Sequence, residues 1–156
     1  MFYIMALDML AKQNPHERDA HISFEEGPHI YTIDGESDFM SVTTWNHSHF
    51  AEFHADTIIT NMMKGKKWEQ SKYYGMTREE IKAQWEANRD EAAQAGTKMH
   101  YDIECYYNGM DVSNDSTEYA YFNRFLEDHP DFVPYRTEWM VWDTELRFAG
   151  SIDMVY

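Results

Sequence analysis

The sequence has one cysteine, Cys105, and few residues that interrupt regular structure, with seven glycines and four prolines among 156 residues. A lone cysteine forms no internal disulfide and cannot supply the ligands of an iron–sulfur cluster. The scarcity of glycine and proline excludes collagen-like and linker-like chains. No apolar run approaches the roughly 20 residues that span a bilayer, so we expect a soluble protein without a membrane segment.

Basic residues are also scarce: 13 Lys and Arg stand against 28 Asp and Glu, a formal charge of −15. Such a charge repels phosphate backbones unless cations neutralise the acids or the basic residues are grouped. The first ten residues are apolar but contain Asp8 and no basic n-region, so they do not resemble a secretory signal. We therefore expect a cytoplasmic protein, located in the host cytoplasm if it is viral.

Apolar and aromatic residues are plentiful, at 43% and 16% of the chain, which is enough to build a core. The length fits one domain, and no repeat or composition break argues for a second. We predict a single domain over residues 1–156, with residues 1–20 as a variable N-terminal segment.

Local patterns predict a hairpin first and helices after it. Residues 21–34 alternate around a Glu-Glu-Gly-Pro turn and precede Asp34-Gly35, which predicts an N-terminal β-hairpin. Apolar spacing from Thr43 to Met62, through Phe50 and Phe53, predicts one helix that packs on the core and ends at Gly65.

The rest of the chain predicts two more helices and two strands. Thr77–Glu80 forms a capping box that starts a long helix, with Gly96 as a break or close-packing point and Asn108-Gly109 as its end. A helix capped within 115–118 stops before Pro130, and strands 135–142 and 146–156 flank a tight turn. The fold class is α+β, with helices packed on a small mixed or antiparallel sheet.

Two segments carry side chains suited to a metal site. His100 and Glu104 are four residues apart and share a helical face. Asp153 follows Gly150-Ser151-Ile152 on a strand, after the strand that bears Glu138, and an aspartate among apolar residues is costly to bury unless it is paired or metal-bound. Together they offer the nitrogen and oxygen ligands of Mg²⁺ or Mn²⁺. The alternatives are a surface His/Glu pair and an edge-strand aspartate that faces water.

These residues resemble a known family. The pattern Gly96-x-x-x-His100-x-x-x-Glu104, then Glu138, then Gly150-x-x-Asp153 resembles the RecB-type branch of the PD-(D/E)XK nuclease superfamily, which includes viral and phage exonucleases. The likeness extends upstream over His29-x-Tyr31-x-Ile33-Asp34-Gly35, Ser41-Val42-Thr43-Thr44 and the aromatic segment with Phe50, Phe53 and Asp56. It covers roughly residues 29 to 156.

The resemblance implies a restriction-endonuclease-like core and a divalent-metal-dependent nuclease, most simply an exonuclease acting on linear DNA in recombination, repair or viral DNA processing. By this likeness His100 and Asp153 are metal ligands, with Asp153 as the central carboxylate, and Glu104 and Glu138 are supporting acids. A recombination partner protein would also fit such a role.

The chain departs from the family where an acid-x-lysine motif should follow. It stops at Tyr156 within an apolar strand, so we expect a truncated chain of weak or no activity, with that motif about 10 to 25 residues further on. Alternatively, a second copy covers the open sheet edge in a homo-oligomer.

The remaining candidates concern other binding roles. Lys64, Lys66, Lys67 and Lys72, interleaved with Trp68, Tyr73 and Tyr74, and with Lys98 further along, are the candidate nucleic-acid-binding residues, although lysines also favour a solvated helix end. His47, His49 and His54 raise the alternative of a His/Asp metal-binding protein. A non-catalytic nuclease-like module that binds DNA or a partner is the other alternative. Cys105 is expected to be a buried structural thiol.

Overall fold

The computed structural model describes residues 7–156, whose contacts divide into two compact units. The first unit comprises the described residues up to Phe50 together with Met99–Tyr156, and the second comprises Ala51–Lys98. The single domain expected over 1–156 stays a prediction. Within the expected N-terminal segment, residues 1–6 lie outside the described part, and α1 (Met9–Gln13) and the 3-10 helix η1 (Glu17–His21) follow.

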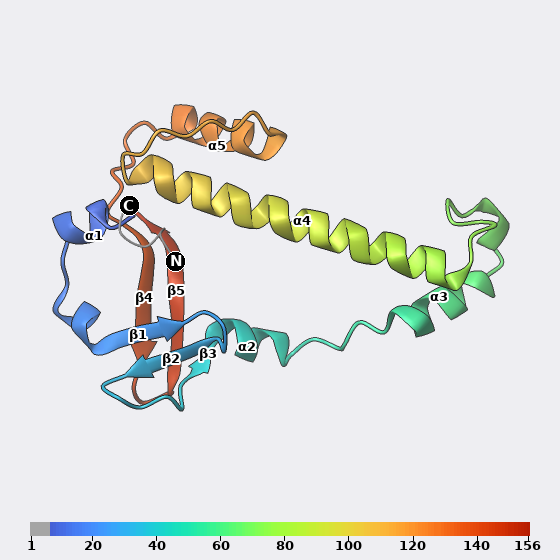
Figure 1. The fold of residues 1–156 in the computed structure, drawn as a ribbon, viewed down its shortest axis with the longest axis horizontal. Helices are drawn as coiled ribbons and strands as arrows, with labels where there is room; N and C mark the ends of the chain where they lie inside the picture. The colour runs from blue at the N-terminus through green and yellow to red at the C-terminus, as the bar shows by residue number, and fades with distance from the viewer. Residues whose placement is uncertain (1–6) are drawn as a thin grey trace. The chain divides into compact units, whose positions relative to one another are not determined.

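The predicted N-terminal hairpin is present in the first unit. Strands β1 (Ile22–Glu25) and β2 (Ile30–Ile33) lie side by side in Figure 1 and pair antiparallel. Their register sets Ile22 opposite Ile33. Asp34 and Gly35 follow with left-handed φ angles of 51° and 88°. Asp and Gly tolerate this conformation better than other residues, so the predicted turn at these positions is confirmed.

A three-stranded mixed sheet forms the rest of the β structure. Strands β4 (Arg136–Asp143) and β5 (Phe148–Val155) pair antiparallel, and the short β3 (Met40–Ser41) pairs parallel with the start of β5. The order is β3-β5-β4, so the predicted α+β class with a small mixed sheet is confirmed. Strand β4 pairs along one side of β5, whereas β3 pairs with the other side only at Phe148 and Ala149. Among the described residues, no strand covers that side of β5 beyond Ala149. A second copy at this edge stays a prediction.

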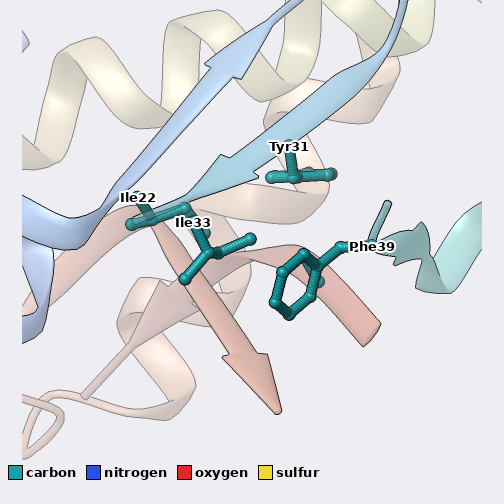
Figure 2. Close-up of a cluster of buried hydrophobic side chains, with 5 residues drawn as sticks. Ile22, Tyr31, Ile33 and Phe39 are labelled. Carbon is teal, nitrogen blue, oxygen red and sulfur yellow. The ribbon is translucent and has the colours of Figure 1, made fainter. Parts of the chain in front are cut away.

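The hairpin and the sheet bury one face against each other. Figure 2 shows the side chains of Ile22, Tyr31, Ile33 and Phe39, which form a buried cluster with Ala149 of β5. Met140 and Trp142 of β4 pack against it. These elements bury part of their apolar side chains in this cluster, and such burial is the main stabilising contribution in a fold of this size.

Helix α4 (Arg78–Tyr107) ends in the first unit, where it meets α1 and α5 (Thr117–Asp128). Leu10, Tyr107, Tyr119 and Phe122 form a second buried cluster there. The end of α4 is a Schellman motif: Gly109 has a φ of 75°, and the Met110 N–H donates to the Cys105 carbonyl at 3.0 Å. The predicted C-terminus at Asn108-Gly109 is therefore confirmed, and Cys105 is buried as expected.

The single helix predicted from Thr43 to Gly65 is wrong. The structure has α2 (Val42–His47) and α3 (Ala55–Met63), separated by residues 48–54. The Ser48 hydroxyl donates to the Trp45 carbonyl at 2.6 Å, where α2 ends. Phe50 and Phe53 are 70% and 68% exposed, so their helical spacing does not mark a buried stripe, and neither of them packs on the core.

The second unit contains α3, the 3-10 helix η2 (Trp68–Gln70) and the first part of α4, with Ile59 and Ile81 fully buried. The predicted capping box is confirmed, because the Thr77 N–H donates to Glu80 at 2.7 Å and the Glu80 N–H donates to the Thr77 hydroxyl at 3.2 Å.

The expectation of a break or close packing at Gly96 is wrong. Helix α4 continues through it, and within 4 Å a Cβ at Gly96 would meet no described atom other than those of its own stretch of helix. None of the helices in the described chain is both long and apolar enough to cross a membrane.

Candidate metal centre

Three side chains from three elements of the first unit converge on one point. His100 of α4, Glu138 of β4 and Asp153 of β5 each offer a ligand atom, and these atoms all lie within 4.8 Å of one another. His100 Nδ1 is 3.6 Å from Asp153 Oδ2. The structure thus brings together the helical imidazole and the strand carboxylate that the sequence analysis singled out, and Glu138 joins them.

The pairing of β4 with β5 places two carboxylates opposite each other. Thr137 faces Met154 and Trp139 faces Ile152, so the same register sets Glu138 opposite Asp153. Like charges in directly opposed positions destabilise a strand pair. Glu138 also has a left-handed φ of 46°, which is unfavourable for a residue with a Cβ and is concentrated at functional sites. A bound cation would remove the repulsion between the two carboxylates.

Ser151 holds Glu138 in the cluster, and the sequence analysis missed it. Its hydroxyl donates to Glu138 Oε2 at 3.1 Å. Ser151 and Asp153 are two residues apart on β5 and therefore point to the same face of the sheet. That spacing is the sequence signal that could have identified Ser151 as a positioning residue.

Gly150 allows helix α2 to approach β5 next to the site. A Cβ at Gly150 would lie 3.3 Å from Val42 Cγ2, which is closer than ordinary contact. The side chain of Val42, the first residue of α2, therefore packs closely on the backbone of Gly150.

Glu104 lies in the same cleft but is not one of the three converging ligands. The cleft has a volume of about 230 Å³, and His100, Glu104, Glu138 and Asp153 are among its lining residues. Partial burial, together with the nearby charge of Glu138, raises the pKa of Glu104 from 4.5 to about 7. Near neutral pH this carboxyl can therefore both hold and release a proton.

The chemistry of these donors suits a hard divalent cation. One imidazole nitrogen and two carboxylates are common ligands of Mn²⁺, and the carboxylates also suit Mg²⁺. The side chains of His100 and Asp153 are 53% and 66% exposed, so the cluster is open to solvent and to a large substrate. The described lining of the cleft contains no lysine or arginine.

The predicted nucleic-acid-binding residues all lie in the second unit. Lys64 follows α3, Lys66 and Lys67 occupy the next turn, Trp68 is in η2, and Lys98 is on α4. Lys72 Nζ lies 4.8 Å from the centre of the Tyr73 ring, and the Trp68 and Tyr74 rings are 5.9 Å apart. The expected interleaving of lysines and aromatic rings is therefore present around η2.

The three histidines considered as a separate metal site do not form one in the structure. His47, His49 and His54 are exposed, His49 packs edge-on against Trp45 at 4.5 Å, and His54 lies 3.9 Å from Glu52. In the part of the chain that the structure describes, only the His100–Glu138–Asp153 cluster brings three such ligands together.

Comparisons of the chain with protein-family models, with curated proteins and with solved structures find no match.

Proposed function

We propose that this protein is a divalent-metal-dependent nuclease that hydrolyses phosphodiester bonds of linear DNA at the His100–Glu138–Asp153 cluster. The convergence of these three side chains from separate elements is the observation that carries the proposal. In line with the resemblance, we propose exonucleolytic cleavage in recombination, repair or viral DNA processing, with Mg²⁺ or Mn²⁺ as the ion.

The residues have distinct roles in this proposal. His100 and Asp153 hold the ion, and Glu138, fixed by the Ser151 hydroxyl, completes the ligand set. When bound, such an ion lowers the pKa of water and neutralises charge on the phosphate. Glu104, with its pKa of about 7, can accept or return a proton within the cleft. Because no lysine or arginine among residues 7–156 lines this cleft, we expect slow cleavage.

The first test is metal binding by titration calorimetry. His100→Ala and Asp153→Asn should each weaken Mn²⁺ binding by about tenfold or more, with unchanged circular dichroism, because both side chains are exposed. Asp131→Asn is the matched control, since Asp131 is exposed and lies outside the cluster. Wild-type protein that binds neither Mn²⁺ nor Mg²⁺ would contradict the proposal.

The second test is nucleotide release from end-labelled linear DNA with Mg²⁺ or Mn²⁺. Release that requires the ion and disappears in Asp153→Asn supports a nuclease. Metal binding without any cleavage would instead favour a non-catalytic nuclease-like module or a metal-binding protein.

A further inference from the structure

Charge is divided unevenly between the two units. The second unit, Ala51–Lys98, holds eight basic and eight acidic residues, whereas the rest of the chain holds five basic and 20 acidic residues and so carries the whole formal charge of −15. A polyanion approaching the second unit meets no net repulsion from it. This unit is therefore the better surface for a phosphate backbone.

The second unit also contains an open cleft with aromatic walls. The cleft has a volume of about 860 Å³ and is lined by residues that include Phe53, Asp56, Lys82, Trp85, Glu86 and Arg89. The Phe53 and Trp85 rings are 5.8 Å apart at an angle of 49°, and Phe53 is 68% exposed. An exposed ring of this size beside a second ring provides a stacking surface.

The Trp85 ring is held in place from behind. Its Nε1–H donates to the Tyr73 hydroxyl at 2.9 Å, and the two rings lie 6.0 Å apart, edge to face. A fixed indole loses little freedom when a ligand stacks on it, which favours binding.

Two cations flank Trp85 on the same face of α4. Lys82 and Arg89 lie three residues before and four residues after Trp85, and helical residues with this spacing are neighbours. Lys82 pairs with Asp56 at 3.0 Å and Arg89 with Asp90 at 2.7 Å. Both pairs are exposed, and exposed pairs are weak, so a phosphate can compete for both cations.

We infer that the cleft at Phe53 and Trp85 binds unpaired bases of single-stranded nucleic acid by stacking, while Lys82 and Arg89 contact the adjacent phosphates. Aromatic surfaces flanked by cations bind single strands because every unpaired base presents a π-face, whereas the bases of a duplex are already stacked. The inference goes beyond the proposed hydrolysis and does not depend on the metal cluster.

The test measures binding of a fluorescent oligothymidylate of about 20 nucleotides by anisotropy, with EDTA present. Phe53→Leu keeps an apolar side chain but removes the ring, so it should weaken binding about fivefold or more, whereas Phe53→Tyr should stay close to wild type. Phe50→Leu is the matched control, because Phe50 is also about 70% exposed and does not line the cleft. The logarithm of the binding constant falls linearly with the logarithm of the salt concentration, and Lys82→Gln and Arg89→Gln should each reduce the steepness of this line by about 0.7.

The inference is overturned if wild-type protein does not bind the oligonucleotide, or binds duplex DNA equally well. It is also overturned if Phe53→Leu binds like wild type or no worse than Phe50→Leu. The same measurements in the Asp153→Asn background separate this outcome from the nuclease proposal, because that variant removes the metal ligand and leaves the cleft intact.

Discussion

Glu104 illustrates how the environment of one residue changes its chemistry. In the sequence it is one helical turn after His100, which alone says nothing of its protonation. In the structure it is half-buried, and the charge of Glu138 adds to the effect of burial, so that its pKa rises to about 7. The fold therefore keeps a protonated carboxyl in the cleft over a pH range in which the unfolded chain has lost that proton.

This difference predicts a pH-dependent stability. Between pH 4.5 and about 7 the folded protein binds more protons at Glu104 than the unfolded chain does, so the free energy of unfolding falls as the pH rises through this range. In the wild type, the free energy of unfolding should fall by about 1 to 2 kcal/mol more over this pH range than it does in Glu104→Gln. This difference is smaller than the full pKa shift implies, because solvent partly screens the carboxyl.

Urea denaturation at pH 5 and pH 8 without divalent ions measures this change. Glu127→Gln, at an exposed position on α5, should keep the wild-type dependence. An unchanged pH dependence in Glu104→Gln would show that burial does not perturb this carboxyl.

At the scale of the elements, α4 shows which signals act locally. Its start is specified by the reciprocal bonds of Thr77 and Glu80, and its end by Gly109 in a left-handed conformation. These interactions span only a few residues, so they were predictable. The single helix expected from Thr43 to Gly65 failed because apolar spacing does not show whether a core exists to receive Phe50 and Phe53, which are exposed.

Replacement by alanine should have opposite effects at Gly96, within α4, and at Gly109, just after its end. Gly96→Ala should raise the free energy of unfolding by about 0.5 to 1 kcal/mol, because alanine favours a helix interior and its Cβ would clash with no other part of the described chain.

Gly109→Ala should lower the stability by about 1 kcal/mol or more, since its φ is 75° and a Cβ would lie 3.4 Å from Met9 Sδ. Thermal or chemical denaturation compares the two variants with wild type. A destabilised Gly96→Ala would show that α4 does not run unbroken through that position.

At the scale of the whole molecule, the charge of −15 predicts the response to salt. Because this charge belongs to the first unit, the melting temperature should rise as monovalent salt screens repulsion within it. At matched ionic strength Mn²⁺ should add a further few degrees, because an ion that binds only the folded state stabilises it by about 2.7 kcal/mol at 100 times its Kd.

Differential scanning fluorimetry separates the two effects. Asp153→Asn should keep the response to monovalent salt and lose the extra shift with Mn²⁺, while Asp131→Asn should keep both. An equal Mn²⁺ shift in Asp153→Asn would place the bound ion elsewhere in the molecule.

Caps, turns, the hairpins and the helical face shared by His100 and Glu104 could be read from the chain, because they arise from contacts within a few residues. Residue types that are able to bind a metal could be identified from the chain as well, since the chemistry of a side chain does not depend on the fold.

The assembly of the candidate site and the environment of its side chains depend on packing between residues that are far apart in the sequence. The register of β4 against β5 puts Glu138 opposite Asp153, and the packing of α4 near β5 brings His100 to the same point. Burial and the charge of Glu138 together raise the pKa of Glu104. Coulomb energy and desolvation depend on distances in space, and no spacing along the chain reports those distances.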